Sequence, residues 1–405
     1  MLIKKLETRF YRNLSGSLPE LSCGINILCG ENAAGKTNTL EAMFAFASGK
    51  SFRTSREKEL ISRGKDFAEA SLVFEKNGFD RSLSLSVTAD GQGVKKRMSV
   101  DGQPVNKASE FLGQFRAVLF TPDHMSLIKG GPEERRRLVD LALCQIKPRY
   151  VKSLNEYEKI LAQRNAYLKK VKFGELKFDA DYLDVLSGQL SRAGAIIARQ
   201  RSMFCGHLSQ SACEMYSKLT DEREELCVKY IGFSKHADFC DEKQTANELY
   251  RIYSKNVDSD LSLGRTFCGP HRDELMIFIS SNPENFTSEA LKNTQDGELS
   301  QADIQDKAAL RLSDFAARSF GSQGQQRSAV LSLKLAEGEI IRSLTGEYPV
   351  FLLDDLFSEL DMGRRSRLSR LLYNRQTVIT CCEASGICAD SEVNLIHVKD
   401  GKYVV

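Results

Sequence analysis

The chain has 405 residues, enough for two or three packed units with a sizeable hydrophobic core. Its formal net charge is only +3, so a nucleic-acid site would have to be a local patch and not a property of the whole surface. The 11 cysteines form no C-x-x-C pair, which favours reduced thiols and disfavours a zinc site. No apolar run approaches the ~18 residues of a membrane-spanning helix, and the N-terminus lacks a signal-peptide core, so we expect a cytoplasmic protein.

Residues 1–130 are rich in strand patterns. Alternating runs at residues 68–74 and 83–87 predict strands, and Asp101-Gly102 predicts a hairpin turn. The sequence therefore predicts a β-rich lobe in this part of the chain.

A strand-type run at residues 24–29 and a helical run at residues 37–47 enclose a segment that fits the phosphate-binding pattern G-x-x-x-x-G-K-[ST]. In such a loop the backbone N–H groups and the helix N-terminus bind phosphate oxygens, which predicts bound ATP. Lys36 would reach the β- and γ-phosphates, and the Thr37 hydroxyl would hold Mg²⁺. A chance glycine-rich turn is the alternative. The predicted phosphate-binding residues are Gly30, Glu31, Asn32, Ala33, Ala34, Gly35, Lys36 and Thr37.

From residue 131 to residue 262 the sequence becomes helical and charged. Long periodic runs at residues 150–172 and 182–219, with a break near Phe173-Gly174, predict an antiparallel helical arm. Basic residues accompany the apolar stripe of its first helix, and they indicate either a solvated face or a face toward DNA. These basic residues are Lys152, Lys159, Arg164, Lys169 and Lys170.

Residues 263–405 return to a compact pattern, interrupted by a polar segment at residues 280–313 for which the sequence indicates no function. An apolar run of buried-strand type at residues 349–353 ends in Asp354 and Asp355. A phosphate-binding loop needs such a carboxylate strand as its partner. The alternative for two acids at a strand end is a turn or a helix cap.

The acidic residues have separate predicted roles. Asp354 fits a Mg²⁺ ligand beside Thr37, and Asp355 fits a group that orients the attacking water. Lys36 and Asp355 are therefore the catalytic candidates. Asp123, in a turn after an apolar run, is a weaker Mg²⁺ candidate.

Residues 322–325 (S-Q-G-Q) precede a strong helical run at residues 328–341 and resemble the S-G-G-Q type signature of ABC ATPases. A serine hydroxyl, a glycine N–H and a helix N-terminus can together contact a γ-phosphate. The resemblance implies that this segment completes the ATP site of a second subunit, and that residues 358–361 form the D-loop at the same dimer interface. The predicted contacts are Ser322, Gly324 and Gln325.

Together these motifs resemble those of the RecF family of recombination and repair ATPases, whose heads resemble those of SMC and other ABC-type proteins. The resemblance covers most of the chain and implies an α/β fold. This fold is an ABC-type P-loop ATPase head with a β-rich N-terminal lobe and an inserted helical arm domain. Further motifs that carry the resemblance lie at residues 49–56, 135–140, 163–165, 269–273 and 353–361.

The resemblance implies a weak, DNA-stimulated ATPase that forms ATP-driven dimers on double-stranded DNA near single-strand gaps. Such a protein would act in recombinational repair and replication-fork maintenance at the nucleoid, helping RecR and RecO to load RecA, and hydrolysis would reset the dimer. We expect DNA contacts to phosphates and not to bases. The candidates are Arg53, Arg56, Lys95, Lys96, Arg97, Arg135 and Arg136.

The chain departs from the family pattern at residues 380–382, where Thr380 is followed by two cysteines and no switch histidine is present. Three alternatives to an ATP-driven switch are open from the sequence. They are a non-hydrolytic, nucleotide-gated DNA scaffold, the nucleotide subunit of an ABC transporter, and a small-molecule P-loop kinase. The arm argues against the transporter, and the signature helix argues against the kinase.

Overall fold

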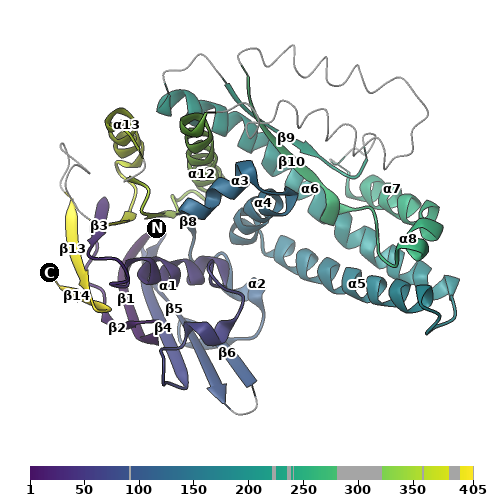
Figure 1. Cartoon of the computed structure of the whole chain (residues 1–405), viewed down its shortest axis with the longest axis horizontal. Helices are drawn as coiled ribbons and strands as arrows, with labels where there is room; N and C mark the ends of the chain where they lie inside the picture. The colour runs from purple at the N-terminus through teal and green to yellow at the C-terminus, as the bar shows by residue number, and fades with distance from the viewer. Residues whose placement is uncertain are drawn as a thin grey trace.

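The computed structural model describes residues 1–90, 93–220, 225–234, 239, 241–280, 322–357, 360–382 and 393–404. Figure 1 shows a head, in which both ends of the chain lie, and a long helical arm that extends from it. Nearly all of the polar segment predicted at residues 280–313 lies outside the described residues. Within these ranges, no helix combines the length and the apolar character needed to cross a membrane.

The N-terminal lobe is an antiparallel sheet with the strand order β2-β1-β4-β5-β6-β7. Its strands alternate buried and more exposed side chains, as in β4, because one face covers the core. The predicted turn Asp101-Gly102 joins β6 to β7 with φ values of 49° and 76°, as a two-residue hairpin loop requires. The strands are β1 (Leu2–Tyr11), β2 (Leu14–Ser17), β4 (Phe67–Lys76), β5 (Phe79–Asp90), β6 (Gly93–Val100) and β7 (Gln103–Val105).

The second sheet has the order β14-β13-β3-β12-β11-β8 and is parallel except where β13 pairs with β14. Strands β3, β8, β11 and β12 are buried at every position, which explains their continuous apolar sequences. Ile27 and Leu353 face the core shared with the arm, whereas Leu28 and Leu352 face the core shared with the N-terminal lobe. The strands are β3 (Ile25–Cys29), β8 (Ala117–Phe120), β11 (Val350–Asp354), β12 (Thr377–Cys381), β13 (Asn394–Lys399) and β14 (Lys402–Val404).

Helix α1 (Lys36–Ser48) packs between the two sheets, where it contacts β8, β11 and β12 on one side and β1, β4 and β5 on the other. Helix α12 (Gln323–Thr345) contacts β8 and the long arm helix α6. The predicted order of strand, phosphate-binding loop and helix is therefore present. The other helices of the head are η1 (Glu57–Leu60), α2 (Ala108–Phe111), η2 (Pro122–Met125), α3 (Ser126–Lys129) and α13 (Met362–Leu372).

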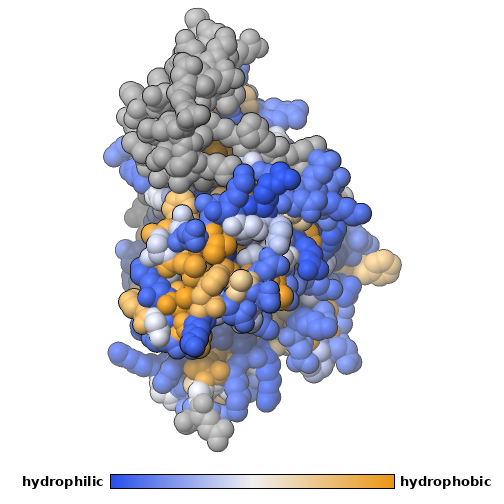
Figure 2. Space-filling model, turned by 90° about the vertical axis from the view of Figure 1, so that its right-hand side faces the viewer, coloured by the Kyte–Doolittle hydropathy of each residue, from blue (hydrophilic) through white to orange (hydrophobic). Residues whose placement is uncertain are grey.

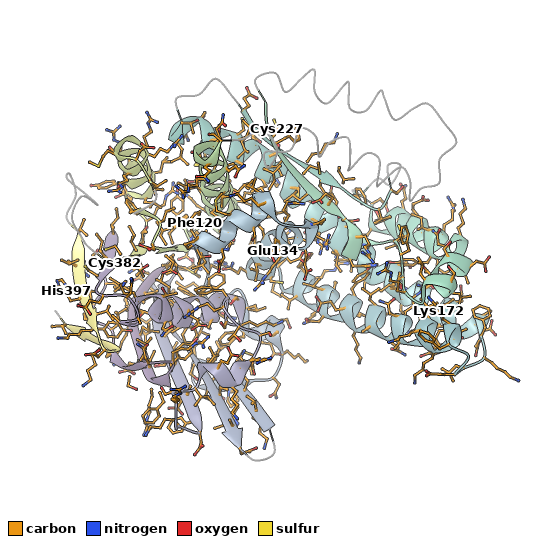
Figure 3. All side chains as sticks on the ribbon, viewed as in Figure 1. Phe120, Glu134, Lys172, Cys227, Cys382 and His397 are labelled. Carbon is orange, nitrogen blue, oxygen red and sulfur yellow. The ribbon has the colours of Figure 1, made fainter. Side chains whose placement is uncertain are left out.

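The arm consists mainly of two long antiparallel helices, α5 and α6, that pack along each other (Figure 1). Helix α5 ends at Lys172 and α6 begins at Ala180, which confirms the break predicted near Phe173. Figure 3 places Lys172 at the far end of the arm, opposite to Cys382 and His397 in the head. The elements of this region are α4 (Pro132–Ile146), α5 (Pro148–Lys172), α6 (Ala180–Leu219), β9 (Glu225–Ile231), α7 (Glu242–Lys255), α8 (Val257–Leu263), η3 (Pro270–Arg272) and β10 (Glu274–Ser280).

Arg164 lies inside the arm and not on the charged outer face that its spacing suggested. Its Nη1 donates to Asp260 Oδ2 and to Thr266 Oγ1, both at 2.7 Å. Asp260 Oδ1 also accepts a hydrogen bond from the backbone N–H of Phe267 at 2.9 Å. The ion pair therefore ties α5 to α8 and to the chain that follows it, and removal of either partner would leave a buried charge uncompensated.

Candidate nucleotide-binding site

The loop between β3 and α1 is closely packed against the C-terminal hairpin. A Cβ atom at Gly30 would meet the carbonyl oxygen of Val398 at 2.2 Å, so only glycine fits there. Gly35 has a φ of 117°, a conformation that side chains rarely allow. The backbone N–H of Gly401 donates to Ala34 O at 2.8 Å. The loop therefore has the glycine-dependent conformation of an anion-binding loop, and β13–β14 supports it.

Lys36 lies within this loop. Its ammonium group donates to Gly30 O at 2.6 Å and to Glu31 O at 2.8 Å. The side chain is only 9% exposed. A cation is thus held at the centre of the loop by weak backbone acceptors, where phosphate oxygens would be stronger partners.

Thr37 and Asp354 meet at the mouth of the loop. Thr37 Oγ1 donates to Asp354 Oδ1 at 2.9 Å, and the hydroxyl of Thr380 donates to the same oxygen at 2.7 Å. Burial raises the pKa of Asp354, and the two hydroxyl groups oppose that shift. Because Mg²⁺ prefers oxygen ligands from a carboxylate together with substrate phosphates, this donor set fits Mg²⁺.

Asp355 follows directly and has a left-handed backbone with a φ of 50°. Its backbone N–H donates to Thr380 Oγ1 at 3.0 Å. Thr380 therefore fixes both acids of the carboxylate strand. No local sequence pattern predicts this contact of Thr380, because its partners lie on the neighbouring strand.

Two asparagines outside the phosphate-binding motif, Asn13 and Asn38, lie beside the loop. Asn13 Nδ2 donates to Ala33 O at 3.1 Å, and Asn38 Nδ2 donates to Asn13 Oδ1 at 2.7 Å. Arg53 Nη1 in turn donates to Asn38 Oδ1 at 2.6 Å, which places this predicted DNA contact near the phosphate-binding loop. Asn13 lies in the turn between β1 and β2, far from the motif in sequence, and no local pattern identifies it.

Cys382 lies in the segment 380–382, where a switch histidine would be expected. Its thiol donates to the side-chain oxygen of Asn32 in the phosphate-binding loop at 3.2 Å, and the thiol is exposed.

Glu41 of α1 is the centre of a buried polar network. Arg12 pairs with Glu41 at 2.8 Å, and Ser51 Oγ donates to Glu41 at 2.5 Å. Glu41 thereby links α1 to the family-type segment at residues 49–56.

The signature segment forms the N-terminal cap of α12. Ser322 Oγ accepts from Gln325 N at 3.2 Å, and Gln325 Oε1 accepts from Ser322 N at 2.6 Å. This reciprocal capping box fixes the first turn of the helix. A Cβ atom at Gly324 would meet the guanidinium of Arg364 at 3.0 Å, so the glycine allows an arginine to lie against this turn.

Three of the predicted DNA-contacting side chains form hydrogen bonds or ion pairs within the protein. Arg135 is buried and pairs with Glu274 at 2.9 Å while also donating to two backbone carbonyls. Arg136 donates to Asp273 O at 2.7 Å, and Lys96 donates to Glu57 at 2.7 Å. These contacts argue against the DNA role that charge alone suggested, most strongly for Arg135.

The remaining candidates lie on the surface. The exposed group consists of Arg53, Arg56, Lys95 and Arg97, although Lys95 also pairs with Asp90 at 3.3 Å. Asp123 is exposed in η2, and among the described residues neither Thr37 nor Asp354 is hydrogen-bonded to it. Its predicted Mg²⁺ role therefore gains no support from contacts.

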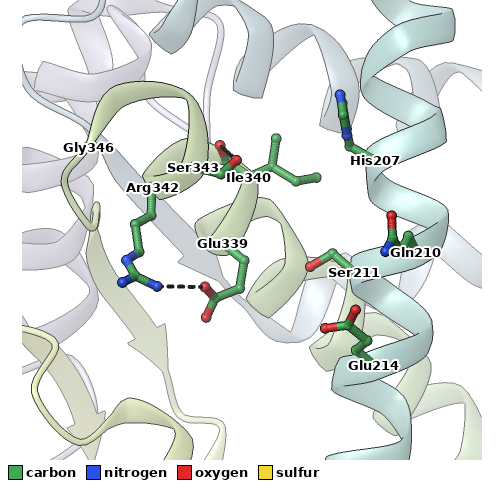
Figure 4. A pocket seen from close by; sticks show the side chains of 9 residues that line it. All are labelled: His207, Gln210, Ser211, Glu214, Glu339, Ile340, Arg342, Ser343 and Gly346. Carbon is green, nitrogen blue, oxygen red and sulfur yellow. Dashed lines mark hydrogen bonds and ion pairs between the residues drawn. The ribbon is translucent and has the colours of Figure 1, made fainter.

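A separate polar cavity of about 500 Å³ lies between α6 and the C-terminal part of α12 (Figure 4). His207 and Glu214 of α6 and Glu339 and Arg342 of α12 are among the residues that line it, and Arg342 pairs with Glu339 at 3.9 Å. None of the predicted nucleotide-binding residues lines this cavity.

The strand, the glycine loop, the carboxylate strand and the capped signature helix on one mixed α/β scaffold define an ABC-type ATPase head. Comparisons with known proteins agree. A family model described as the RecF/RecN/SMC N terminal domain matches residues 2–402. The chain is 36% identical over 383 residues to the DNA replication and repair protein RecF of Ruminiclostridium cellulolyticum, covering 94% of this chain and 92% of that protein.

The corresponding protein of Clostridium beijerinckii is 34% identical over 404 residues, covering 99% of this chain and 98% of that protein. A solved structure of the recombination mediator protein RecF with ATP, described as part of the RecFOR pathway, superposes with a TM-score of 0.81 at 28% identity, covering 99% of this chain and 98% of that one. An Smc head bound to ScpA shares the fold, with a TM-score of 0.51 at 15% identity over 100% of this chain and 96% of that one. The chain belongs to the RecF family.

Proposed function

We propose that this protein is an ATP-dependent DNA-binding protein of recombinational repair and replication-fork maintenance. The observation that carries the proposal is the contact of Thr37 with Asp354, because it joins two halves of an ATPase site that lie 317 positions apart in the sequence. Relatives named for DNA replication and repair, and a solved RecF structure that contains ATP, support it.

The loop residues fit ATP and Mg²⁺. Lys36 would exchange its two carbonyl partners for phosphate oxygens, and Thr37 and Asp354 would present adjacent oxygen ligands to Mg²⁺. Thr37 and Asp354 would hold Mg²⁺, which would supply positive charge beside the reacting phosphates. Asp355, held through its backbone by Thr380, would orient the attacking water.

A second copy of the chain would complete this site. Ser322, Gly324 and Gln325 form a rigid helix start whose first N–H groups suit an anion, which supports a contact to the γ-phosphate held by the partner. ATP would then join two heads, and hydrolysis would remove the link and reset the dimer.

The dimer would bind double-stranded DNA near single-strand gaps through exposed basic side chains. Contacts of this type read phosphates and not bases, so affinity should depend strongly on salt. The description of solved relatives as parts of the RecFOR pathway supports cooperation with RecR and RecO. This cooperation would help to load RecA, in the cytoplasm at the nucleoid. The residues proposed for duplex contacts are Arg53, Arg56, Lys95 and Arg97.

The test measures molecular mass by light scattering and duplex affinity by anisotropy, each without nucleotide, with ADP and with ATP. We expect dimers and tighter duplex binding with ATP alone. Ser322→Arg should abolish the dimer while monomers still bind ATP, and Ser262→Arg, at an exposed position in α8, is the matched control.

A monomer with unchanged duplex affinity in all three nucleotide states would contradict the switch. Loss of ATP binding by Ser322→Arg monomers would contradict the role of the signature in a partner's site. ATP-induced dimers that form and dissociate without phosphate release would instead favour the non-hydrolytic scaffold.

A further inference from the structure

The far end of the arm exposes apolar side chains to solvent. Figure 2, which looks onto this end of the molecule, shows hydrophobic residues gathered on the face. We call residues 169–185 the arm tip. A soluble protein rarely exposes several large apolar side chains close together without a binding function. The exposed apolar residues of the arm tip are Phe173, Leu176, Phe178, Tyr182 and Val185.

Two aromatic rings of the arm tip are free. Phe173 is 63% exposed and Phe178 is 47% exposed, and neither packs against another ring among the residues that the structure describes. Tyr182, in contrast, packs edge-on against Tyr167 with ring centroids 5.0 Å apart. The two phenylalanine rings therefore offer faces to a flat ligand.

The turn that carries these rings is held firmly. The hydroxyl of Tyr167 accepts from Asp179 N at 2.6 Å and donates to Asp179 O at 3.2 Å. Gln163 Nε2 donates to Tyr182 OH at 2.8 Å. Because α5 and α6 fix both ends of the turn, binding would cost little ordering of the backbone.

Lysines interleave with the rings. Their side chains are exposed, and within the described part of the chain none of them forms an ion pair or a side-chain hydrogen bond. These ammonium groups are therefore available to a polyanion. The four lysines are Lys169, Lys170, Lys172 and Lys177.

Four acids accompany the four lysines, so residues 169–185 as a whole carry no net charge. Asp179 caps α6 by accepting from Tyr182 N at 3.0 Å, and Asp184 accepts from the hydroxyl of Tyr250 at 2.5 Å. Glu175 and Asp181 remain as exposed acids. Lys169, Lys170 and Lys172 lie together in the last turn of α5, whereas Asp181 and Asp184 lie in α6. The end of α5 is therefore locally positive.

We infer that the arm tip is a binding site for single-stranded nucleic acid, in which bases stack on Phe173 and Phe178 while lysines contact the phosphates. Free aromatic faces combined with unpaired lysines are the chemistry of sequence-neutral single-strand binding. Helix α5 has 25 residues and so places the tip ~35–40 Å from its own start near the head. The inference rests on the proposed DNA function and assigns the single-stranded side of a gap to a separate element.

The test uses the full-length protein without nucleotide and a labelled thymidine oligonucleotide of about 16 residues, with affinity measured by anisotropy. The double variant Phe173→Ala/Phe178→Ala should bind this strand about tenfold or more weakly. Phe79→Ala is the matched control, because Phe79 is 74% exposed on the N-terminal lobe and should not affect binding.

A strand of equal length without bases separates stacking from charge. The double phenylalanine variant should bind this abasic strand as the wild type does. Lys169→Ala/Lys170→Ala should weaken binding of both strands and lower the slope of log affinity against log salt by about 0.7 for each lost phosphate contact. Lys107→Ala, at an exposed lysine of the N-terminal lobe, should leave both unchanged.

Unchanged affinity of the phenylalanine variant for the thymidine strand would overturn the inference, as would an equal loss on the abasic strand. Either result would indicate that the arm tip binds a protein partner and not nucleic acid. If the protein forms no ATP-induced dimer but binds the thymidine oligonucleotide through the arm tip, only the proposed ATP-driven dimerisation is contradicted. ATP-driven duplex binding without any effect of the tip variants contradicts only this inference.

Discussion

Thr380 supports both acids of the carboxylate strand, although its own side chain is neutral. Its hydroxyl donates to Asp354 and accepts from the backbone N–H of Asp355. A hydroxyl can serve in both directions at once, which no apolar residue of the same shape can do. The orientation of the predicted Mg²⁺ ligand therefore depends on a residue on the neighbouring strand.

Thr380→Val should reduce ATP hydrolysis about 10-fold to 100-fold, because groups that orient a metal ligand usually have effects of that size. The rate of phosphate release measures this loss of ATP hydrolysis. Thr377→Val is the matched control on β12, since among the described residues its hydroxyl bonds only to Arg375 O, at 3.1 Å. A similar loss of activity in both variants would show that strand stability, and not the orientation of Asp354, is responsible.

Asp355→Asn should keep ATP binding but slow phosphate release about 100-fold or more, because the amide cannot accept a proton from the attacking water. The ATP-induced dimer should therefore live longer, which light scattering after removal of free ATP would detect. Unchanged phosphate release would exclude a catalytic role for this carboxylate.

Asp273 is a buried acid at the end of the segment 269–273. Burial raises its pKa to about 7, against the opposing effect of Arg201, and the hydroxyl of Tyr230 donates to it. A raised pKa in the folded state means that its contribution to stability is complete below pH 4 and is lost as the pH rises through about 7.

Asp273→Asn should therefore gain stability relative to the wild type as the pH rises from about 5 to about 8. The difference in Tm between the two proteins, measured by calorimetry across this range, tests the sign. A difference that stays constant with pH would show that the carboxyl group does not titrate there.

At the scale of elements, the β13–β14 hairpin holds the phosphate-binding loop in place. Its turn residue Gly401 has a φ of 74°, and a Cβ atom there would meet Asn13 O at 1.9 Å. The same residue donates its N–H to Ala34. The β13–β14 hairpin therefore supports the candidate nucleotide site without carrying any nucleotide motif.

Gly401→Ala should lower ATP affinity several-fold, because the methyl group pushes the hairpin away from Asn13 and the loop. Gly102→Ala is the control: its φ is 76°, but no atom lies within 4 Å of the added methyl group. Both variants should lose about 1 kcal/mol of stability from the left-handed backbone. Equal ATP affinities, measured by calorimetric titration, would contradict the supporting role of the hairpin.

Sequence patterns predicted the elements whose signals are local. The loop flanked by β3 and α1, the apolar strand that ends in Asp354 and the break between α5 and α6 follow from spacing within a few residues. The positions of Asn13, Thr380 and Gly401 could not be predicted, because their partners are distant in sequence. Arg164 and Arg135 were misjudged for the same reason: burial of a charge depends on a partner from another element.

At the scale of the molecule, both ends of the chain build one head, and the arm is inserted between them. The central strand β3 pairs with β12 and β13, which follow it by more than 340 residues. The arm then connects the two halves through α6, which packs against α12. A movement of the signature helix α12 would therefore be transmitted directly to the arm helix α6.

Ala336→Leu in α12 tests this contact, since the residue is fully buried in the core that α12 shares with the arm. Overpacking of such a site typically costs about 1–3 kcal/mol. We expect a lower Tm together with weaker ATP-stimulated duplex binding, whereas binding of ATP itself should change little. Weakened ATP binding with normal duplex binding would contradict transmission through α12.

The order of the strands also affects how the protein is made. A ribosome that has translated only as far as residue 376 has produced β3, but neither of its neighbours. The apolar edges of β3 remain unpaired until β12 and β13 have been translated, and during that time they are open to non-native pairing. Nascent chains of this protein should therefore need protection by chaperones until these two strands are made, and a chain terminated before residue 377 would lack both neighbours of β3.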